Sequence, residues 1–167
     1  MAGHKPVSPL SLAELAPKTE AIEPLRQLKA AGYLLIATTH QPQLSSGALD
    51  RRELERMHDL LRRVFCLDDI CVCPHDPADG CPCRKPQPGL LTEAAFKWHL
   101  NLEQSFVLGN KWQDAEAARN AGCTSILIAS PWIGQGHHDI VLPNVAEAVR
   151  LIGRLRNSLL AAHGSSS

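Results

Sequence analysis

The sequence predicts an α/β fold, with a Rossmann-like and mostly parallel sheet that has helices on both faces. Apolar runs of strand length alternate with segments of helical periodicity through most of the 167 residues. The connections between them are short, which is typical of repeated strand–helix units. The run 33–38 is almost entirely apolar, as expected of a parallel strand that is buried on both faces.

Each element has its own signal. The first helix shows apolar residues at helical spacing and is closed by Gly32. The second alternates charged residues with Leu54 and Met57 on one face. Residues 88–89 open a third helix, and Gly122 ends an alanine-rich fourth. These patterns predict helices over 20–31, 50–64, 90–98, 114–120 and 145–160, and strands over 33–38, 70–72, 105–108, 125–129 and 140–142.

Length and composition indicate one globular domain. A chain of 167 residues can build one core but is short for two, and 44% hydrophobic with 20% charged residues is ordinary for a folded protein. Residues 1–18 are expected to be a surface segment, because they contain three prolines and little apolar periodicity. The domain is then expected over 19–163, with a disordered tail at 164–167.

Charge and hydropathy exclude several classes of partner. Seventeen basic and seventeen acidic residues cancel, so the chain has no net field for nucleic acid or an anionic membrane. No apolar run is long enough to span a bilayer. The N-terminal residues lack the apolar core of a signal peptide, so we expect a cytoplasmic protein in which thiols stay reduced.

One short loop collects the chain's metal-binding side chains. Four of them fall within eleven residues, as Cys73, His75, Cys81 and Cys83. Two close pairs joined by a flexible turn can wrap one zinc ion, and three thiolates with one imidazole would complete a structural site. The alternatives are disulfides or a chance cluster of free cysteines. The three remaining cysteines are scattered through apolar segments, which favours zinc over a disulfide framework.

Polar residues gather where the predicted strands end. They form three pairs along the chain, namely Thr39 with Gln41, Arg84 with Lys85, and Asn110 with Asp114. In open parallel sheets, ligands bind beyond the carboxyl ends of the strands. These pairs therefore predict a ligand site at one edge of the sheet.

Nearly the whole chain resembles the haloacid dehalogenase superfamily, in the branch of the heptose bisphosphate and histidinol phosphatases. The resemblance rests on the Thr-His-Gln strand end, the Cys-Pro-His…Cys-Pro-Cys-Arg-Lys-Pro loop, the Gly-Asn-Lys-Trp-Gln-Asp segment and the Asn-Ala-Gly-Cys strand entry. It implies the haloacid dehalogenase fold, carbohydrate metabolism and hydrolysis of a small phosphorylated sugar or polyol.

The resemblance also implies roles for the strand-end residues. Thr39 would bond the transferring phosphoryl oxygens and Lys85 would neutralise their charge, while Gln41 and Arg84 would bind substrate. Asn110 and Asp114 would hold magnesium. Stabilisation of charge is the main contribution that a protein makes to phosphoryl transfer.

Two departures from the family concern its chemistry. Family members begin with a strand that ends in Asp-x-Asp-Gly, which supplies the nucleophile, and this chain has no Asp-x-Asp. The Gly-Asp of the magnesium segment is Gly109-Asn110 here, and an amide offers the ion no charge, so magnesium binding is expected to be weak. We therefore expect this chain to be an inactive phosphatase as it stands. The alternative is a catalytically dead homologue that acts as a zinc-stabilised phosphate-ligand-binding or regulatory protein.

A third departure concerns the sheet. In the family, the strand that is missing here lies at the centre, between the strands expected at 33–38 and 105–108. Its loss would leave two unpaired edges inside the core. Either the natural start lies upstream, or the homologue is degenerate and a protein partner or self-association covers the open sheet.

Overall fold

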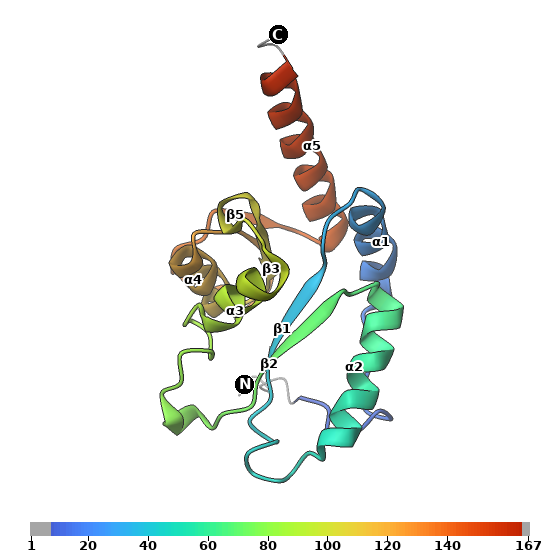
Figure 1. Ribbon diagram of the computed structural model, residues 1–167, viewed down its shortest axis with the longest axis vertical. Coiled ribbons are helices and arrows are strands. Elements are labelled where there is room, and N and C mark those ends of the chain that lie inside the picture. The colour runs from blue at the N-terminus through green and yellow to red at the C-terminus, as the bar shows by residue number, and fades with distance from the viewer. Residues whose placement is uncertain (1–7, 165–167) are drawn as a thin grey trace.

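The computed structural model describes residues 8–164 and contains two parallel sheets (Figure 1). One sheet pairs β1 (Ile36–His40) with β2 (Asp69–Cys73). The other has the order β3-β4-β5, formed by Phe106–Gly109, Thr124–Ile128 and Ile140–Leu142. Both ladders of the second sheet are parallel. The predicted α/β class with parallel pairing is therefore confirmed.

Within residues 8–164, five α-helices connect and cover the strands. They are α1 (Ile22–Ala30), α2 (Arg51–Phe65), α3 (Gly89–Trp98), α4 (Trp112–Ala121) and α5 (Val145–Gly164). Three short 3₁₀ turns, η1 to η3, span Thr19–Ala21, Pro77–Asp79 and Leu102–Gln104. In β4, the consecutive residues Ile126 and Leu127 are both fully buried. Since neighbouring strand residues point to opposite faces, both faces of this sheet are covered.

The two sheets are separated by a gap between β1 and β3. Within residues 8–164, no backbone hydrogen bond joins these strands, and every residue of both is only half-buried. Four of the five residues of β2, by contrast, are buried. The gap lies where the expected central strand would pair. Within residues 8–164, the buried apolar side chains form three clusters, of which one joins α1 and α5 to β4, one lies between β2 and α3, and one lies along α2.

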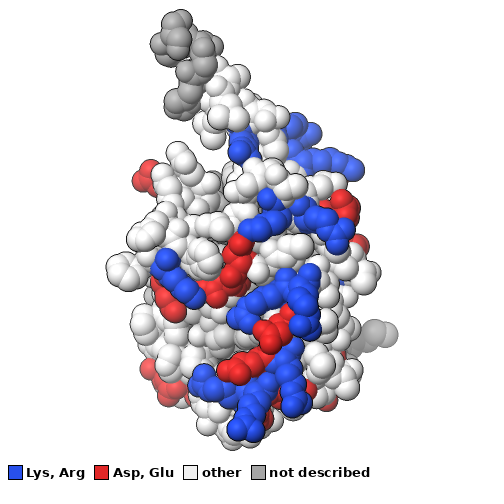
Figure 2. Space-filling model, turned by 45° about the vertical axis from the view of Figure 1, so that its right-hand side comes forward, with Lys and Arg blue, Asp and Glu red and all other residues white. Residues whose placement is uncertain are grey.

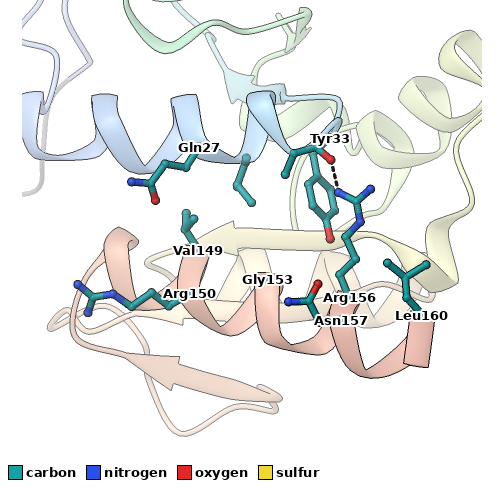
Figure 3. A pocket seen from close by; sticks show the side chains of 10 residues that line it. Gln27, Tyr33, Val149, Arg150, Gly153, Arg156, Asn157 and Leu160 are labelled. Atoms are coloured by element: carbon teal, nitrogen blue, oxygen red, sulfur yellow. Dashed lines mark hydrogen bonds between the residues drawn. The ribbon is translucent and has the colours of Figure 1, made fainter. Parts of the chain in front are cut away.

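The largest apolar cluster joins α1 and α5 to β4. Beside it lies a pocket of about 410 Å³ between the two helices (Figure 3). The guanidinium of Arg156 crosses this pocket, donates to the carbonyl oxygen of Ala31 and lies 5.4 Å from the centre of the Tyr33 ring. The cation of Arg156 thus fastens α5 to the end of α1. Beyond this contact between α1 and α5, the C-terminal part of α5 projects from the body of the molecule (Figure 1).

The face drawn in Figure 2 mixes both signs of charge. Ion pairs three residues apart, such as Arg56 with Glu53 and Arg62 with Asp59, occupy the surface of α2. No helix within residues 8–164 is both long and apolar enough to cross a membrane.

Several element boundaries differ from those expected. The first strand begins at Ile36, three residues late, because Tyr33 and Leu35 have other partners: the Tyr33 amide donates to Leu28 and the Leu35 amide to Asp68. The last helix runs to Gly164, past the expected end at 160. The rest of the expected tail, and residues 1–7 of the expected surface segment, lie outside the described residues.

A candidate metal centre beside a strand-end anion site

The four predicted zinc ligands converge at the end of β2. Their ligand atoms all lie within 4.8 Å of one another. The Cys81 sulfur lies 3.5 Å from those of Cys73 and Cys83, and the Nδ1 atom of His75 lies 3.1 Å from Cys83 and 3.7 Å from Cys73. A zinc tetrahedron with Zn–S bonds of about 2.3 Å has edges of about 3.8 Å, close to these separations. All four atoms therefore reach one centre.

The protonation of these sulfurs also fits a cation. Burial raises the pKa of Cys81, but hydrogen bonds from Cys83 and Cys73 outweigh it and lower that pKa to about 7. Burial and the neighbouring sulfurs raise the pKa of Cys83 to about 12. Without a metal, the cluster thus favours a thiolate at Cys81 and a protonated thiol at Cys83. A divalent ion would stabilise all three thiolates, and separations of 3.5 Å are far from the 2.05 Å of a disulfide.

Local contacts hold the metal loop, residues 73–83, in place. Asp76 caps the turn η2 by accepting from the Ala78 amide. The Nε2 atom of His40, at the end of β1, donates to the carbonyl oxygen of His75 at 2.9 Å. The Gly89 amide donates to the carbonyl oxygen of Pro82 at 3.0 Å, and a Cβ at position 89 would lie only 2.3 Å from that oxygen. The loop thus requires glycine at the start of α3.

Directly after the metal loop, Lys85 forms an ion pair with the first turn of α4. Its Nζ atom lies 2.7 Å from Oδ1 of Asp114. The other carboxylate oxygen accepts from the amides of Asn110 and Lys111, both at 3.1 Å. Asp114 is buried, and a Cβ at position 109 would collide with its carboxylate, so Gly109 is needed here. Lys85 and Asp114 were each predicted as site residues, but their pairing was not.

The residues expected to hold magnesium fit that ion poorly. Asp114 is the only carboxylate among the strand-end residues described above, and both of its oxygens already accept hydrogen bonds. Asn110 would add a neutral oxygen at most. Magnesium prefers several oxygen ligands with anionic charge, so this arrangement suits an ammonium partner better than a hard cation.

The end of β1 forms a second polar group across the gap. The Nε2 atom of Gln41 donates to Oγ1 of Thr39 at 3.1 Å, and the Gln41 amide donates to the carbonyl oxygen of Cys73. Gln41 is 9% exposed, yet its side-chain oxygen has no hydrogen-bond donor among the described residues. No hydrogen bond or ion pair within residues 8–164 links Thr39 or Gln41 to Lys85 or Asp114. The hydrogen bonds and ion pairs therefore join the predicted residues in two groups, Thr39 with Gln41 after β1, and Lys85 with Asn110 and Asp114 at the start of α4.

A pocket of about 330 Å³ lies between the metal loop and α4. Its lining includes Cys81 on one side, Arg84 and Lys85 at the base of the loop, and Trp112 and Gln113 on α4. In the described part of the chain, the Arg84 guanidinium has no hydrogen bond or ion pair. Trp112 and Gln113 were not predicted as site residues, although both lie inside the segment that resembles the family's magnesium motif.

Comparison with known proteins identifies relatives of this fold and site. A family model described as HAD-hydrolase-like matches residues 82–148. The D-glycero-beta-D-manno-heptose-1,7-bisphosphate 7-phosphatase of Pseudomonas aeruginosa is 34% identical over 123 residues, which cover 71% of this chain and 69% of the relative. The enzyme of the same name from Bordetella bronchiseptica is 30% identical over 139 residues, covering 78% and 74%.

Solved structures agree with these relatives. The D,D-heptose 1,7-bisphosphate phosphatase of B. bronchiseptica, in complex with magnesium and phosphate, matches with a TM-score of 0.76 and 26% identity, covering 87% of this chain and 88% of its own. A HAD phosphatase from Thermococcus onnurineus, at 18% identity and a TM-score of 0.60, shares the fold.

The parallel α/β fold of this chain, with polar groups at its strand ends, therefore has the scaffold of the HAD-like hydrolases. Within that class, the chain belongs to the haloacid dehalogenase superfamily, in the branch of the heptose 1,7-bisphosphate phosphatases.

Proposed function

We propose that this chain holds a structural zinc ion at Cys73, His75, Cys81 and Cys83, and binds a phosphorylated sugar beside it without hydrolysing it. The zinc part rests on the donor set and the separations of the four ligand atoms. With all four positions supplied by protein, such an ion would have no place for a reactive water. Its contribution would be to fix the loop that carries Arg84 and Lys85.

The ion pair between Lys85 and Asp114 is the observation that carries the proposal that this site binds its ligand without hydrolysing it. It engages the one strand-end carboxylate, and both oxygens of that carboxylate accept hydrogen bonds. A carboxylate held in this way is a poor nucleophile, and the chain has no Asp-x-Asp to supply another. The cation Arg84 remains unpaired in the described chain, which favours binding of an anion over its hydrolysis.

The chemistry of each group supports a role in binding. Arg84 can bond two phosphoryl oxygens at once, and Lys85 adds a second positive charge. The hydroxyl of Thr39 accepts from Gln41, so its own hydrogen is available to a phosphoryl oxygen. The unpaired side-chain oxygen of Gln41 would accept from a sugar hydroxyl, which relieves the cost of burying it alone.

The ligand class is taken from the relatives, which are named for a heptose bisphosphate. A second function, hydrolysis of such a phosphate monoester, is supported by those relatives and by the magnesium and phosphate in the B. bronchiseptica structure. The poor fit of magnesium to Asn110 and Asp114 favours binding over hydrolysis. The reduced thiols that a zinc site needs agree with a cytoplasmic location.

We also propose that a second copy of the chain or a protein partner covers the gap between β1 and β3. Unpaired strand edges readily take up another strand. Light scattering over a range of concentrations, with hydrogen exchange of the β1 amides, tests this. Self-association that protects those amides supports a second copy, and protection only with a copurifying protein supports a partner. A monomer with rapidly exchanging β1 amides under both conditions contradicts the proposal.

Calorimetric titration of the purified chain with a heptose 1,7-bisphosphate, together with an assay for released phosphate, tests the main function. We expect saturable binding, at least tenfold weaker binding by Lys85→Ala because one charge-assisted contact is lost, and no phosphate release. Arg119→Ala, an exposed arginine on α4, is the matched control and should bind normally. Sustained release of phosphate that Lys85→Ala abolishes would establish the second function in place of the first.

A further inference from the structure

The pocket beside the metal loop has one apolar wall, which an inorganic phosphate ion would not contact favourably. Arg84 and Lys85 form its cationic base, and the side chain of Trp112 forms part of the opposite wall. Trp112 is 43% exposed, although its indole is a large and mostly apolar ring. A flat apolar surface next to an unpaired cation suits a ligand with an anionic end and an apolar face.

The position of Trp112 is fixed by its neighbours. It is the first residue of α4, and its backbone amide donates to the carbonyl oxygen of Trp132 at 3.2 Å. On its other side, Cβ and Cδ1 of Trp112 lie 3.6 Å from the place that a Cβ on Gly134 would occupy. Two residues further along α4, Asp114 binds Lys85. The indole and the carboxylate that holds the Lys85 ammonium therefore belong to the same helical turn, so the placement of the two groups does not depend on a ligand.

The other lining groups fit a polyhydroxylated ligand. Gln113 follows Trp112 in the wall, and its side chain makes no hydrogen bond within residues 8–164. An amide can both donate to and accept from hydroxyl groups. At about 330 Å³, the pocket is at the small end of the range for small-molecule sites and exceeds the space that a phosphate ion alone would fill.

We infer that Trp112 determines the ligand specificity of this site: its indole packs against the carbon chain of a sugar whose phosphate is bound by Arg84 and Lys85. This inference rests on the proposed function, because it adds a sugar contact to the same anion site. It makes the site selective for phosphorylated sugars over inorganic phosphate. Phe96, which is 87% exposed on α3 and does not line the pocket, has no such role.

Calorimetry on the full chain tests the inference with two ligands, a heptose 1,7-bisphosphate and inorganic phosphate. Replacing Trp112 with alanine should weaken sugar bisphosphate binding about tenfold and change inorganic phosphate binding less than twofold. Replacing Trp112 with phenylalanine should restore most of the lost affinity, because an aromatic face is kept. Phe96→Ala is the matched control and should bind both ligands normally. Thermal melting of each variant checks that it is folded.

The outcomes separate this inference from the proposed function. If Trp112→Ala binds the sugar bisphosphate as tightly as the wild type while Lys85→Ala does not, the role of Trp112 is overturned and the anion site stands. If Trp112→Ala loses affinity for both ligands equally, the selectivity is also overturned, since the residue then supports the anion site as a whole. If the wild type binds neither ligand, the proposed function fails, and this inference fails with it.

Discussion

Replacing Asp114 with asparagine should destabilise the fold and, at the same time, strengthen anion binding. An asparagine oxygen could keep the amides of Asn110 and Lys111 only by turning its NH₂ group toward the Lys85 ammonium. The variant therefore loses one charge-assisted hydrogen bond at 2.7 Å. Such bonds contribute about 1.5–3 kcal/mol, and Lys85 is partly solvated, so we expect a loss near 2 kcal/mol.

Anion binding should change in the opposite direction. With the carboxylate gone, Lys85 no longer has a competing negative partner, and its charge is available to phosphate. Urea unfolding measures the first effect and calorimetry with inorganic phosphate the second. Glu116→Gln is the matched control on the same helix, because Glu116 is more exposed and its pairing with Arg119, at 3.9 Å, is weak. The reasoning is refuted if Asp114→Asn unfolds at the same urea concentration as Glu116→Gln, or if it binds phosphate less tightly than the wild type.

Three further variants test the supports of the site. Cys83→Ser should lower the zinc content from about one ion per chain to little or none by elemental analysis, whereas Cys66→Ser, outside the cluster, should keep it. Gly89→Ala places a methyl group 2.3 Å from a backbone oxygen of the metal loop, so it should cost about 1–3 kcal/mol in urea unfolding and weaken zinc retention. Asp69→Asn should lower the melting temperature at pH 7, where the wild-type carboxylate accepts from Lys97, and lower it less as the pH falls below 3.8.

The pH dependence expected of Asp69→Asn follows from the direction in which the pKa of Asp69 is shifted. Burial alone raises the pKa of Asp69, but hydrogen bonds from Lys97 and Trp98 outweigh it and hold that pKa below its usual 3.8. The folded state therefore gains stability from this group above about pH 5, and loses it as the pH falls through 3.8 and below. A melting temperature that differs between wild type and Asp69→Asn equally at pH 7 and pH 2 would contradict this assignment. Normal zinc content in Cys83→Ser would contradict the metal centre, and wild-type stability of Gly89→Ala would contradict the close packing there.

The metal loop could be predicted from the sequence because its ligands are close in the chain. Two pairs, each with a single residue between the ligands, need only one turn between them to converge, and the capped turn η2 provides it. Strand β5 and the start of α3 were likewise predictable from short apolar runs and from residues 88–89. Signals of this kind are local, so tertiary contacts alter them little.

The contacts that decide the chemistry are long-range and could not be predicted. Lys85 and Asp114 are 29 residues apart. The sequence indicated phosphate as the ligand of Lys85 and magnesium as the ligand of Asp114, whereas in the structure the two side chains bind each other. The late start of β1 has a similar cause, because the Leu35 amide donates to the carboxylate of Asp68, 33 residues away in the connection between α2 and β2. Trp112 could not be recognised as a site residue because a tryptophan in an α/β sequence usually packs in the core, whereas its 43% exposure is visible only in the structure.

The central claim is that the chain binds a phosphorylated sugar at the strand ends and does not turn it over. The most direct measurement is a calorimetric titration with a heptose 1,7-bisphosphate in which the same samples are assayed for free phosphate. We expect one saturable binding event per chain, weakened at least tenfold in Lys85→Ala, with no phosphate released. Binding that is unchanged in Lys85→Ala, or continuous release of phosphate by the wild type, would contradict it.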